Sequence, residues 1–200
     1  MAGGSLSMRE RPRSRSAGAA SANRADGQRL EERLRFETLL TELSVQFLNL
    51  PADQVDAAIE DAQRRVCECL DIDLSATWQV SAERPHTLLL THIYRPPGFP
   101  TLPEVMDARE TFPWCLETMG AGRSIVLSRV TDAPAAAARD LEWWRHLGIK
   151  SIVTLPLSTG GSATIGALNF SATRTAREWP VELVTRLERV AQVFASALAR

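Results

Sequence analysis

The sequence lacks a membrane-length hydrophobic run, a secretory signal and the cysteines of a disulfide framework. No apolar stretch approaches the roughly 18 residues that a transmembrane helix needs, and the first residues lack the apolar segment of a signal peptide. Three cysteines are too few for a disulfide-stapled domain and favour a reducing compartment. We therefore expect a cytoplasmic protein with no membrane partner.

The charge balance gives no attraction to nucleic acid. The 200 residues carry 23 Lys and Arg against 24 Asp and Glu, for a formal net charge of -1. A nucleic-acid-binding domain usually has a basic surplus, so we predict no nucleic-acid partner. Lys150 is the only lysine, and this arginine bias, with abundant alanine, indicates a GC-rich bacterial genome.

No motif for nucleophilic, metal or phosphate chemistry is present. The Gly160-Gly161 pair is not followed by the Lys-Ser/Thr of a phosphate loop, and the G-x-S-x-G, H-E-x-x-H and kinase motifs are missing. Cys67 and Cys69 lie two positions apart on a predicted helix, about 200° around its axis, so they do not share a metal. We predict no catalytic residue and no metal site.

Residues 1–28 are rich in Arg, Ser, Ala and Gly and have almost no large apolar side chain. Such a segment cannot bury enough surface to offset the entropy of ordering, which predicts a disordered tail. An organellar transit peptide is the alternative for an Arg- and Ser-rich, acid-poor start. Residues 29–200 have the length of one domain, and the 44% hydrophobic content of the chain suits a globular core.

Amphipathic helices are predicted at both ends of this domain. One covers 30–50, a second runs to about Asp71, and a third follows Pro180, where a proline suits the first turn. The apolar stripes of the first and last helices cover a sheet, and we expect their excess to pair with a second subunit in a parallel bundle, with a monomer as the alternative. The last helix has no stop signal, so we expect it to continue into an output domain. The candidate residues for dimerisation and signalling are Phe36, Leu40, Leu43, Phe47, Leu183, Leu187, Val190 and Phe194.

Strands are predicted where the hydrophobic period changes to two. The first begins at Leu74, where apolar and polar residues start to alternate. A second covers 88–94, and strict alternation places His92 and Tyr94 on the same face as Leu90. Both faces of this strand are largely apolar or aromatic, which predicts a sheet that is covered on both sides.

The rest of the domain alternates between strands and short helices. Gly160 and Gly161 place a tight turn at 159–162 between the last two strands. Hairpin strands with helices grouped at the two ends indicate an α+β domain with a mainly antiparallel sheet. The remaining predicted elements are a proline-rich loop over 95–110, helices over 111–119 and 135–147, and strands over 124–130, 150–158 and 163–172.

With these elements placed, the chain resembles a GAF domain from about residue 30 to residue 200. The resemblance rests on LGIKSIVTLPL, the Gly-Gly turn, IGALNFSATRTAREWP and the closing VAQVFASALAR. The opening RFETLLTELSVQFLNLPADQVDAAIEDA further resembles N-terminal GAF modules of bacterial sensor histidine kinases and related regulators. The family implies a five- or six-stranded antiparallel sheet, with the terminal helices on one face and a ligand pocket on the other. The lid of that pocket would be residues 95–148.

Aromatic side chains concentrate in this implied lid, as they do in pockets for flat ligands. The alternative is that they fill the core, and adjacent Trp143 and Trp144 cannot both face a pocket. Cys115 is followed by Leu116, whereas bilin-carrying relatives usually have histidine there, and His92 is only a weak candidate for a haem ligand. The sequence has no bilin or haem signature, so the cofactor is unknown. The pocket candidates are His92, Tyr94, Phe112, Trp114, Cys115, Trp143, Trp144 and Thr154.

The leading hypothesis is a non-catalytic sensory domain that binds an unidentified small molecule and signals through its terminal helices as a homodimer. It would be the input module of a bacterial two-component, histidine kinase or related system. One alternative is a GAF-fold enzyme that reduces free methionine sulfoxide, for which Cys115 is the only cysteine near the implied pocket. The other is a dimerisation module whose pocket is filled by side chains.

Overall fold

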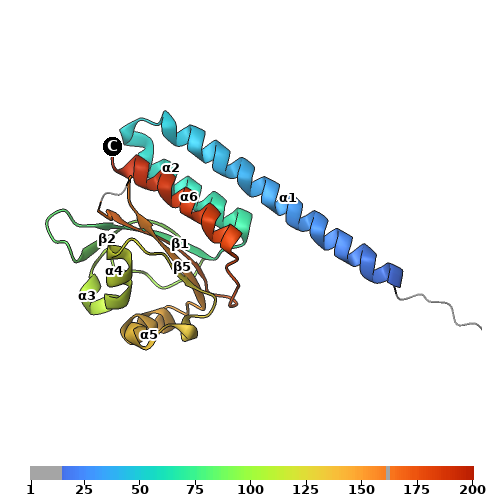
Figure 1. The fold of residues 1–200 in the computed structure, drawn as a ribbon. Helices are drawn as coiled ribbons and strands as arrows, with labels where there is room; N and C mark the ends of the chain where they lie inside the picture. The colour runs from blue at the N-terminus through green and yellow to red at the C-terminus, as the bar shows by residue number, and fades with distance from the viewer. Residues whose placement is uncertain (1–14, 161–162) are drawn as a thin grey trace, which may run out of the picture.

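The computed structural model describes residues 15–160 and 163–200, and its centre is one six-stranded sheet (Figure 1). The order is β3-β2-β1-β6-β5-β4, and every neighbouring pair is antiparallel, which confirms the predicted fold class. The first hairpin therefore joins the last hairpin at the middle of the sheet. The strands are β1 (Leu74–Val80), β2 (Thr87–Tyr94), β3 (Val105–Asp107), β4 (Ile125–Leu127), β5 (Ser151–Leu157) and β6 (Gly166–Ala172).

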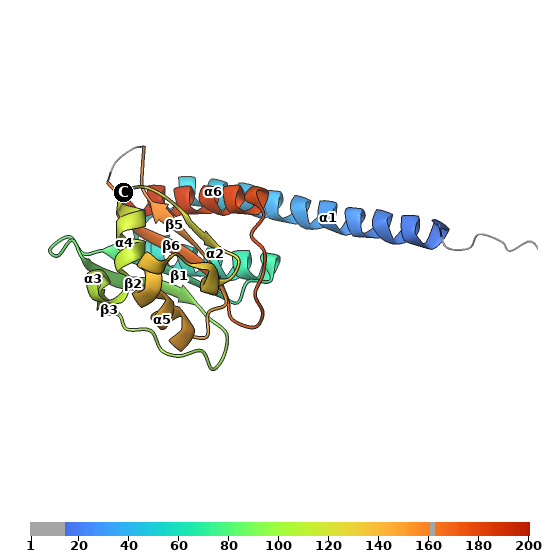
Figure 2. The same ribbon diagram turned by 60° about the horizontal axis from the view of Figure 1, so that its bottom comes forward.

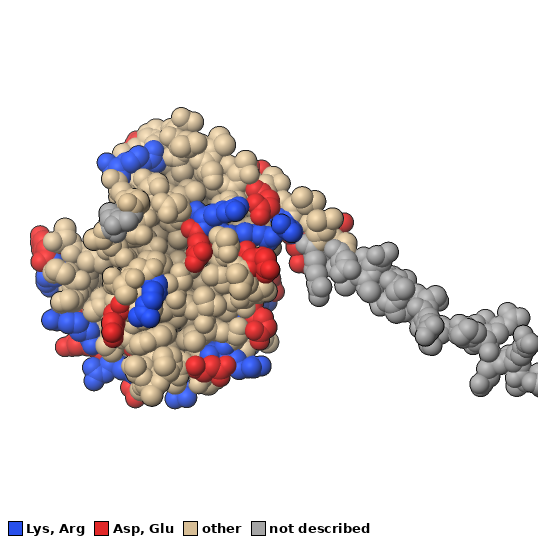
Figure 3. All heavy atoms as spheres, viewed as in Figure 1, with Lys and Arg blue, Asp and Glu red and all other residues tan. Residues whose placement is uncertain are grey.

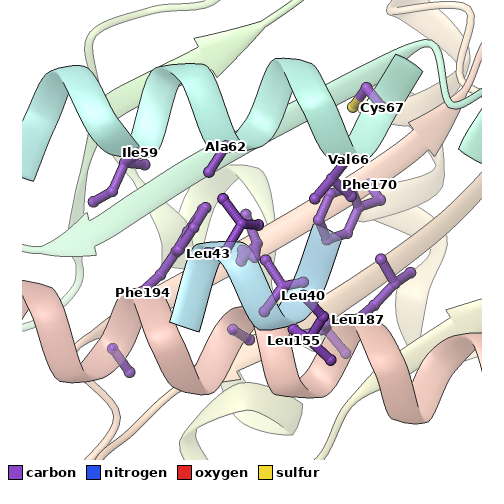
Figure 4. Packing of buried hydrophobic residues seen from close by; sticks show 14 of the residues in the cluster. Leu40, Leu43, Ile59, Ala62, Val66, Cys67, Leu155, Phe170, Leu187 and Phe194 are labelled. Carbon is purple, nitrogen blue, oxygen red and sulfur yellow. The ribbon is translucent and has the colours of Figure 1, made fainter. Parts of the chain in front are cut away.

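Three helices cover one face of the sheet: α1 (Arg15–Leu48), α2 (Val55–Leu70) and α6 (Val181–Leu198) (Figures 1 and 4). Their apolar stripes pack on the sheet residues that point toward them, among them Val153, Leu155 and Phe170. The side chains proposed from sequence for dimer contact belong to this core and are not available to a partner. Leu183 is partly buried against the core, and the fully buried ones are Phe36, Leu40, Leu43, Phe47, Leu187, Val190 and Phe194.

Helix α1 starts earlier than the sequence pattern indicates. Residues 15–28, expected to be disordered, are helical, and residues 1–14 of the predicted tail lie outside the described part. The expectation considered only burial, whereas extending a formed helix is easy and alanine and arginine favour it. The N-terminal part of α1 extends beyond the sheet domain (Figures 1 and 2). Its first described buried side chain is Phe36.

Strand β2 contains a bulge that reverses the faces of its second half. Thr77 of β1 pairs with His92, but the next residue, Trp78, pairs with Leu90, so Thr91 is an extra residue in β2. An inserted residue shifts the alternation of side chains by one. Leu88 and Leu90 therefore share the face of Ile93, away from the terminal helices. The predicted alternation is wrong beyond Leu90, because it assumed an uninterrupted strand.

The opposite face of the sheet is covered by three short helices and the loops between them (Figure 2). These are α3 (Ala108–Thr111), α4 (Pro113–Gly120) and α5 (Ala138–His146), the last preceded by a 3-10 turn at Ala135–Ala137. Strand β3 lies inside the segment expected to be a loop, because three residues are too few to show a period. Of the predicted 159–162 turn, residues 161 and 162 lie outside the described residues.

Candidate ligand-binding cavity

A cavity of about 380 Å³ lies between the sheet and the layer of α3, α4 and α5. Its volume is within the range of small-molecule sites. Its floor comes from five strands and its roof from the α3, α4 and α5 layer. The floor includes Trp78, Leu88, Met106, Ile152, Thr154, Ala167 and Asn169. The roof includes Ala108, Phe112, Cys115, Met119 and Trp144.

Four of the eight residues proposed from sequence line this cavity: Phe112, Cys115, Trp144 and Thr154. Trp144 is 2% exposed, and its ring meets the ring of Trp114 edge to face at 6.4 Å. Trp114 thus supports the roof without lining the cavity.

Trp143 also lies outside the main cavity. It lines a neighbouring space of about 40 Å³ together with Leu147 and Ile149. Its ring lies 6.5 Å from that of Phe112. Of the two adjacent tryptophans, Trp144 is therefore the one that faces the main cavity.

His92 and Tyr94 point to the other face of the sheet because of the bulge at Thr91. His92 is buried against α2, with Nε2 3.1 Å from Oδ1 of Asp56 and Nδ1 2.9 Å from Oγ1 of Thr91. Tyr94 packs against the helical core. Neither side chain reaches the cavity, so the assignment of both to the pocket is wrong, and His92 cannot ligate a haem there.

A buried carboxylate holds the roof helix α4 in place. Asp140 of α5 is fully buried and accepts hydrogen bonds from the backbone N–H of Trp114 (3.3 Å) and Cys115 (2.9 Å). These groups belong to the first turn of α4, where N–H groups have no partner within the helix. The carboxylate thus caps α4 from a neighbouring helix, and its charge is favourable at a helix N-terminus.

The same arrangement makes Cys115 a poor nucleophile. Burial raises the pKa of its thiol well above the usual value, and the charge of Asp140 raises it further. The thiolate is the reactive form of cysteine, so this site disfavours it. Cys67 lies on α2, on the far side of the sheet, where burial also raises the pKa. Among the described residues, no three His, Cys, Asp or Glu side chains are placed to hold a metal ion.

The sequence analysis missed the polar residue at the middle of the cavity floor, Asn169. It lies in β6 directly opposite Thr154 of β5, and its Oδ1 accepts a hydrogen bond from the backbone N–H of Ala76 at 2.9 Å. The signal was available, because an asparagine in the centre of the apolar strand GALNFSA is unusual.

Gly166 allows the two central strands to approach closely at the edge of the cavity. A Cβ built on Gly166 would lie 2.1 Å from the backbone oxygen of Trp78 and 3.1 Å from Cα of Gln79. Both neighbours are backbone atoms that cannot rotate away. Only glycine fits this position without moving β1 from β6.

The charged side chains on one face of the molecule are of mixed sign (Figure 3). On the face seen in Figure 3, Arg and Lys side chains alternate with Asp and Glu side chains, and neither sign forms a broad patch. Among the residues that the structure describes, no helix is long and apolar enough to cross a bilayer.

The fold defines a class of small α+β domains with an antiparallel sheet, terminal helices on one face and short helices over a cavity on the other. The chain belongs to the GAF domain family, whose sequence profile matches residues 37–198. Comparison with curated protein sequences gives no significant match.

Solved structures with the same fold include domains of different activity. A phycocyanobilin-bound GAF domain from a cyanobacterial phytochrome matches 82% of this chain and 93% of its own, with a TM-score of 0.66 and 15% identity. A GAF domain of a phosphoenolpyruvate-protein phosphotransferase from Coxiella burnetii matches 83% of this chain and 94% of its own, with a TM-score of 0.64 and 16% identity. The free methionine-R-sulfoxide reductase of Neisseria meningitidis, in complex with its substrate, matches 82% of this chain and 88% of its own, with a TM-score of 0.61 and 15% identity. At these identities the likeness establishes the fold alone.

Proposed function

We propose that this chain is a non-catalytic sensory GAF domain that binds a small molecule between its sheet and α3–α5. In this proposal it is a cytoplasmic input module of a bacterial two-component, histidine kinase or related system, and α1 and α6 carry its output. The observation that supports this function is the cavity of about 380 Å³, which aromatic and aliphatic side chains line and leave open. A domain with a side-chain-filled interior would not keep such a space.

The floor strands offer a direct connection from the cavity to the terminal helices. In β5, Thr154 lines the cavity, while its neighbours Val153 and Leu155 are buried in the core that holds α1 and α6. In β6, Asn169 likewise lines the cavity, while Phe170 is buried in the core that holds α1 and α6. A ligand that favours one arrangement of these strands would therefore bias the packing of the helices.

We propose that the domain forms a homodimer through an exposed apolar stripe on α1. Its leucines and valine recur at helical spacing on the side opposite to the buried stripe, and apolar residues in such a row are typical of helix pairing. A groove at the end of this surface, between α1 and α6, includes Leu48, Gln192 and Val193. The exposed stripe consists of Leu30, Leu34, Val45 and Leu48.

The reductase alternative has less support. Only Cys115 of the three cysteines lines the cavity, and its thiol has a raised pKa. Cys67 and Cys69 lie on α2, across the sheet from the cavity. A single cysteine without an activating cation nearby does not fit a redox reaction that needs a reactive thiolate.

The experiment is a thermal-shift screen of the wild type against a broad panel of metabolites. A ligand at about 100-fold its Kd stabilises the folded state by about 2.7 kcal/mol, which raises the Tm of a domain of this size by about 5–10 °C. Ala167→Leu, which fills the cavity floor, should abolish the shift. Ala57→Leu, at an exposed position of α2, is the matched control and should retain it. A panel that never raises the Tm of the wild type would remove the basis of the sensory function.

A further inference from the structure

The cavity has no charged side chain among the described residues that line it. The nearest buried charge in the roof, Asp140, is occupied by the backbone N–H groups of Trp114 and Cys115. An ionised ligand would therefore lose its hydration without gaining a counter-charge, which costs several kcal/mol. This composition excludes ions and favours neutral compounds.

One polar spot interrupts the apolar lining. Thr154 and Asn169 face each other across β5 and β6, and side chains in such directly opposite positions are close neighbours. The oxygen of the Asn169 carboxamide is held by the backbone N–H of Ala76. This bond fixes the carboxamide, and its N–H groups have no hydrogen-bond partner among the described residues. The hydroxyl of Thr154 likewise has no partner in the described part of the chain.

The remaining surface of the cavity suits a flat ring. Trp78 belongs to the floor, and Phe112 and Trp144 belong to the roof. Aromatic side chains stack on planar apolar ligands.

We infer that the cavity takes an uncharged, planar and mainly apolar ring compound whose single polar end hydrogen-bonds to Thr154 and Asn169. This inference rests on the proposed sensory function and specifies the class of its ligand. The amide N–H of Asn169 donates to an acceptor on the compound, and the hydroxyl of Thr154 can donate or accept. Carboxylates, phosphates and ammonium ions of the same size are rejected.

The test uses one ring with different head groups, measured by calorimetric titration of the wild-type protein at pH 7. The compounds are 2-naphthol, which is neutral, 2-naphthoate, which is an anion, and 2-naphthylmethylammonium, which is a cation. We expect 2-naphthol to bind about tenfold or more tightly than either ion. Equal or tighter binding of an ion would overturn the inference. This series needs no variant, so it does not depend on how a substitution folds.

A variant then tests the polar end. Thr154→Val keeps the shape of the side chain and should weaken 2-naphthol binding by about two- to tenfold, while binding of unsubstituted naphthalene stays the same. Thr164→Val is the matched control, because Thr164 lines the same cavity but its hydroxyl already donates to the backbone oxygen of Met119 at 3.1 Å. Equal losses for both compounds, or for both variants, would contradict a role of Thr154 in binding the head group.

The outcomes separate this inference from the proposed function. If no naphthalene compound binds but a metabolite stabilises the wild type and not Ala167→Leu, the ligand class is wrong and the sensory function stands. If neither the naphthalenes nor the metabolites bind, both fail.

Discussion

Asp140 of α5 and Cys115 of α4 are joined by a hydrogen bond of 2.9 Å from the cysteine backbone N–H to the carboxylate, although 25 residues separate them. The pair connects two helices of the cavity roof. Burial is the main reason why the pKa of the Cys115 thiol is raised, and the negative charge of Asp140 raises it further. The same carboxylate therefore holds the two roof helices together and adds to the cost of ionising the thiol.

Removing the carboxylate should loosen the roof. We expect Asp140→Ala to lower the free energy of unfolding by about 1–3 kcal/mol, because two buried N–H groups lose their acceptor. Asp140→Asn keeps an acceptor oxygen and should lose less. Urea denaturation measures both, with the exposed Glu142→Ala as the control. An Asp140→Ala variant as stable as the wild type would show that the cap is not needed.

The cysteines should react slowly with alkylating agents. Burial raises the pKa of the thiol in Cys67, Cys69 and Cys115, so the thiolate fraction at pH 7–8 is low at all three. Cys69 is half-buried on α2 whereas Cys67 is fully buried, so Cys69 should be labelled before Cys67. Iodoacetamide labelling followed by mass spectrometry gives the order. Rapid labelling of Cys115 at pH 7 would instead indicate an activated thiol and would reopen the reductase hypothesis.

Gly166 should not accept any side chain. A Cβ at this position would lie 2.1 Å from the backbone oxygen of Trp78, so Gly166→Ala must separate β1 from β6. We expect a loss of about 3 kcal/mol or more in unfolding free energy, or failure to fold. Gly120→Ala is the control, since Gly120 also lines the cavity but has open space around it. Equal stability of the two variants would contradict the tight approach of the central strands.

Acid should weaken the connection between the residue that precedes β1 and the segment that follows β6. Burial of the Asp73 carboxyl alone would raise its pKa, but hydrogen bonds from the backbone N–H of Thr173 (2.8 Å) and Arg174 (3.1 Å), with the Arg174 guanidinium, lower it. A lowered pKa stabilises the fold above the unfolded value of about 3.9, and the contribution is lost as pH falls through the folded value. Asp73→Asn should therefore flatten the loss of stability below pH 4 in acid titrations followed by circular dichroism. Asp53→Asn, at an exposed position, is the control variant.

The exposed stripe on α1 should control assembly without affecting folding. Leu34 is 58% exposed, so Leu34→Glu should keep the Tm and convert the proposed homodimer to a monomer in light scattering. Leu43, which is 1% exposed in the core, provides the contrast, because Leu43→Glu should unfold the domain. A wild-type monomer at high concentration would contradict the dimer directly.

The fold could be predicted where the sequence has a clear period. The start of β1 and the apolar stripes of α1, α2 and α6 follow directly from alternation and helical spacing. Strand β3 could not be found, because three residues carry no period and its position depends on pairing with β2. The helical start of α1 was missed because its sequence has no apolar stripe to indicate it.

The site was also only partly predictable, because the sequence shows periodic patterns but not how the strands pair. Phe112, Cys115 and Trp144 were found because the resemblance to GAF domains implied a lid at residues 95–148, and Thr154 was proposed from the predicted strand over 150–158. His92 and Tyr94 were misplaced because one extra residue, Thr91, reverses the alternation, and a bulge has no sequence signature here. Asn169 was overlooked although its place in an apolar strand is unusual, and only its bond to the N–H of Ala76 depends on the neighbouring strand.

The overhang of α1 has a mechanical consequence. Residues 15–35 precede the first described buried side chain, and at 1.5 Å per residue they form an arm of about 30 Å. A tilt of about 10° at the root of such an arm displaces its tip by about 5 Å. A small repacking at the root of α1 would thus become a displacement of several ångströms at its N-terminal tip. A displacement of this size can change the contacts of a protein bound there.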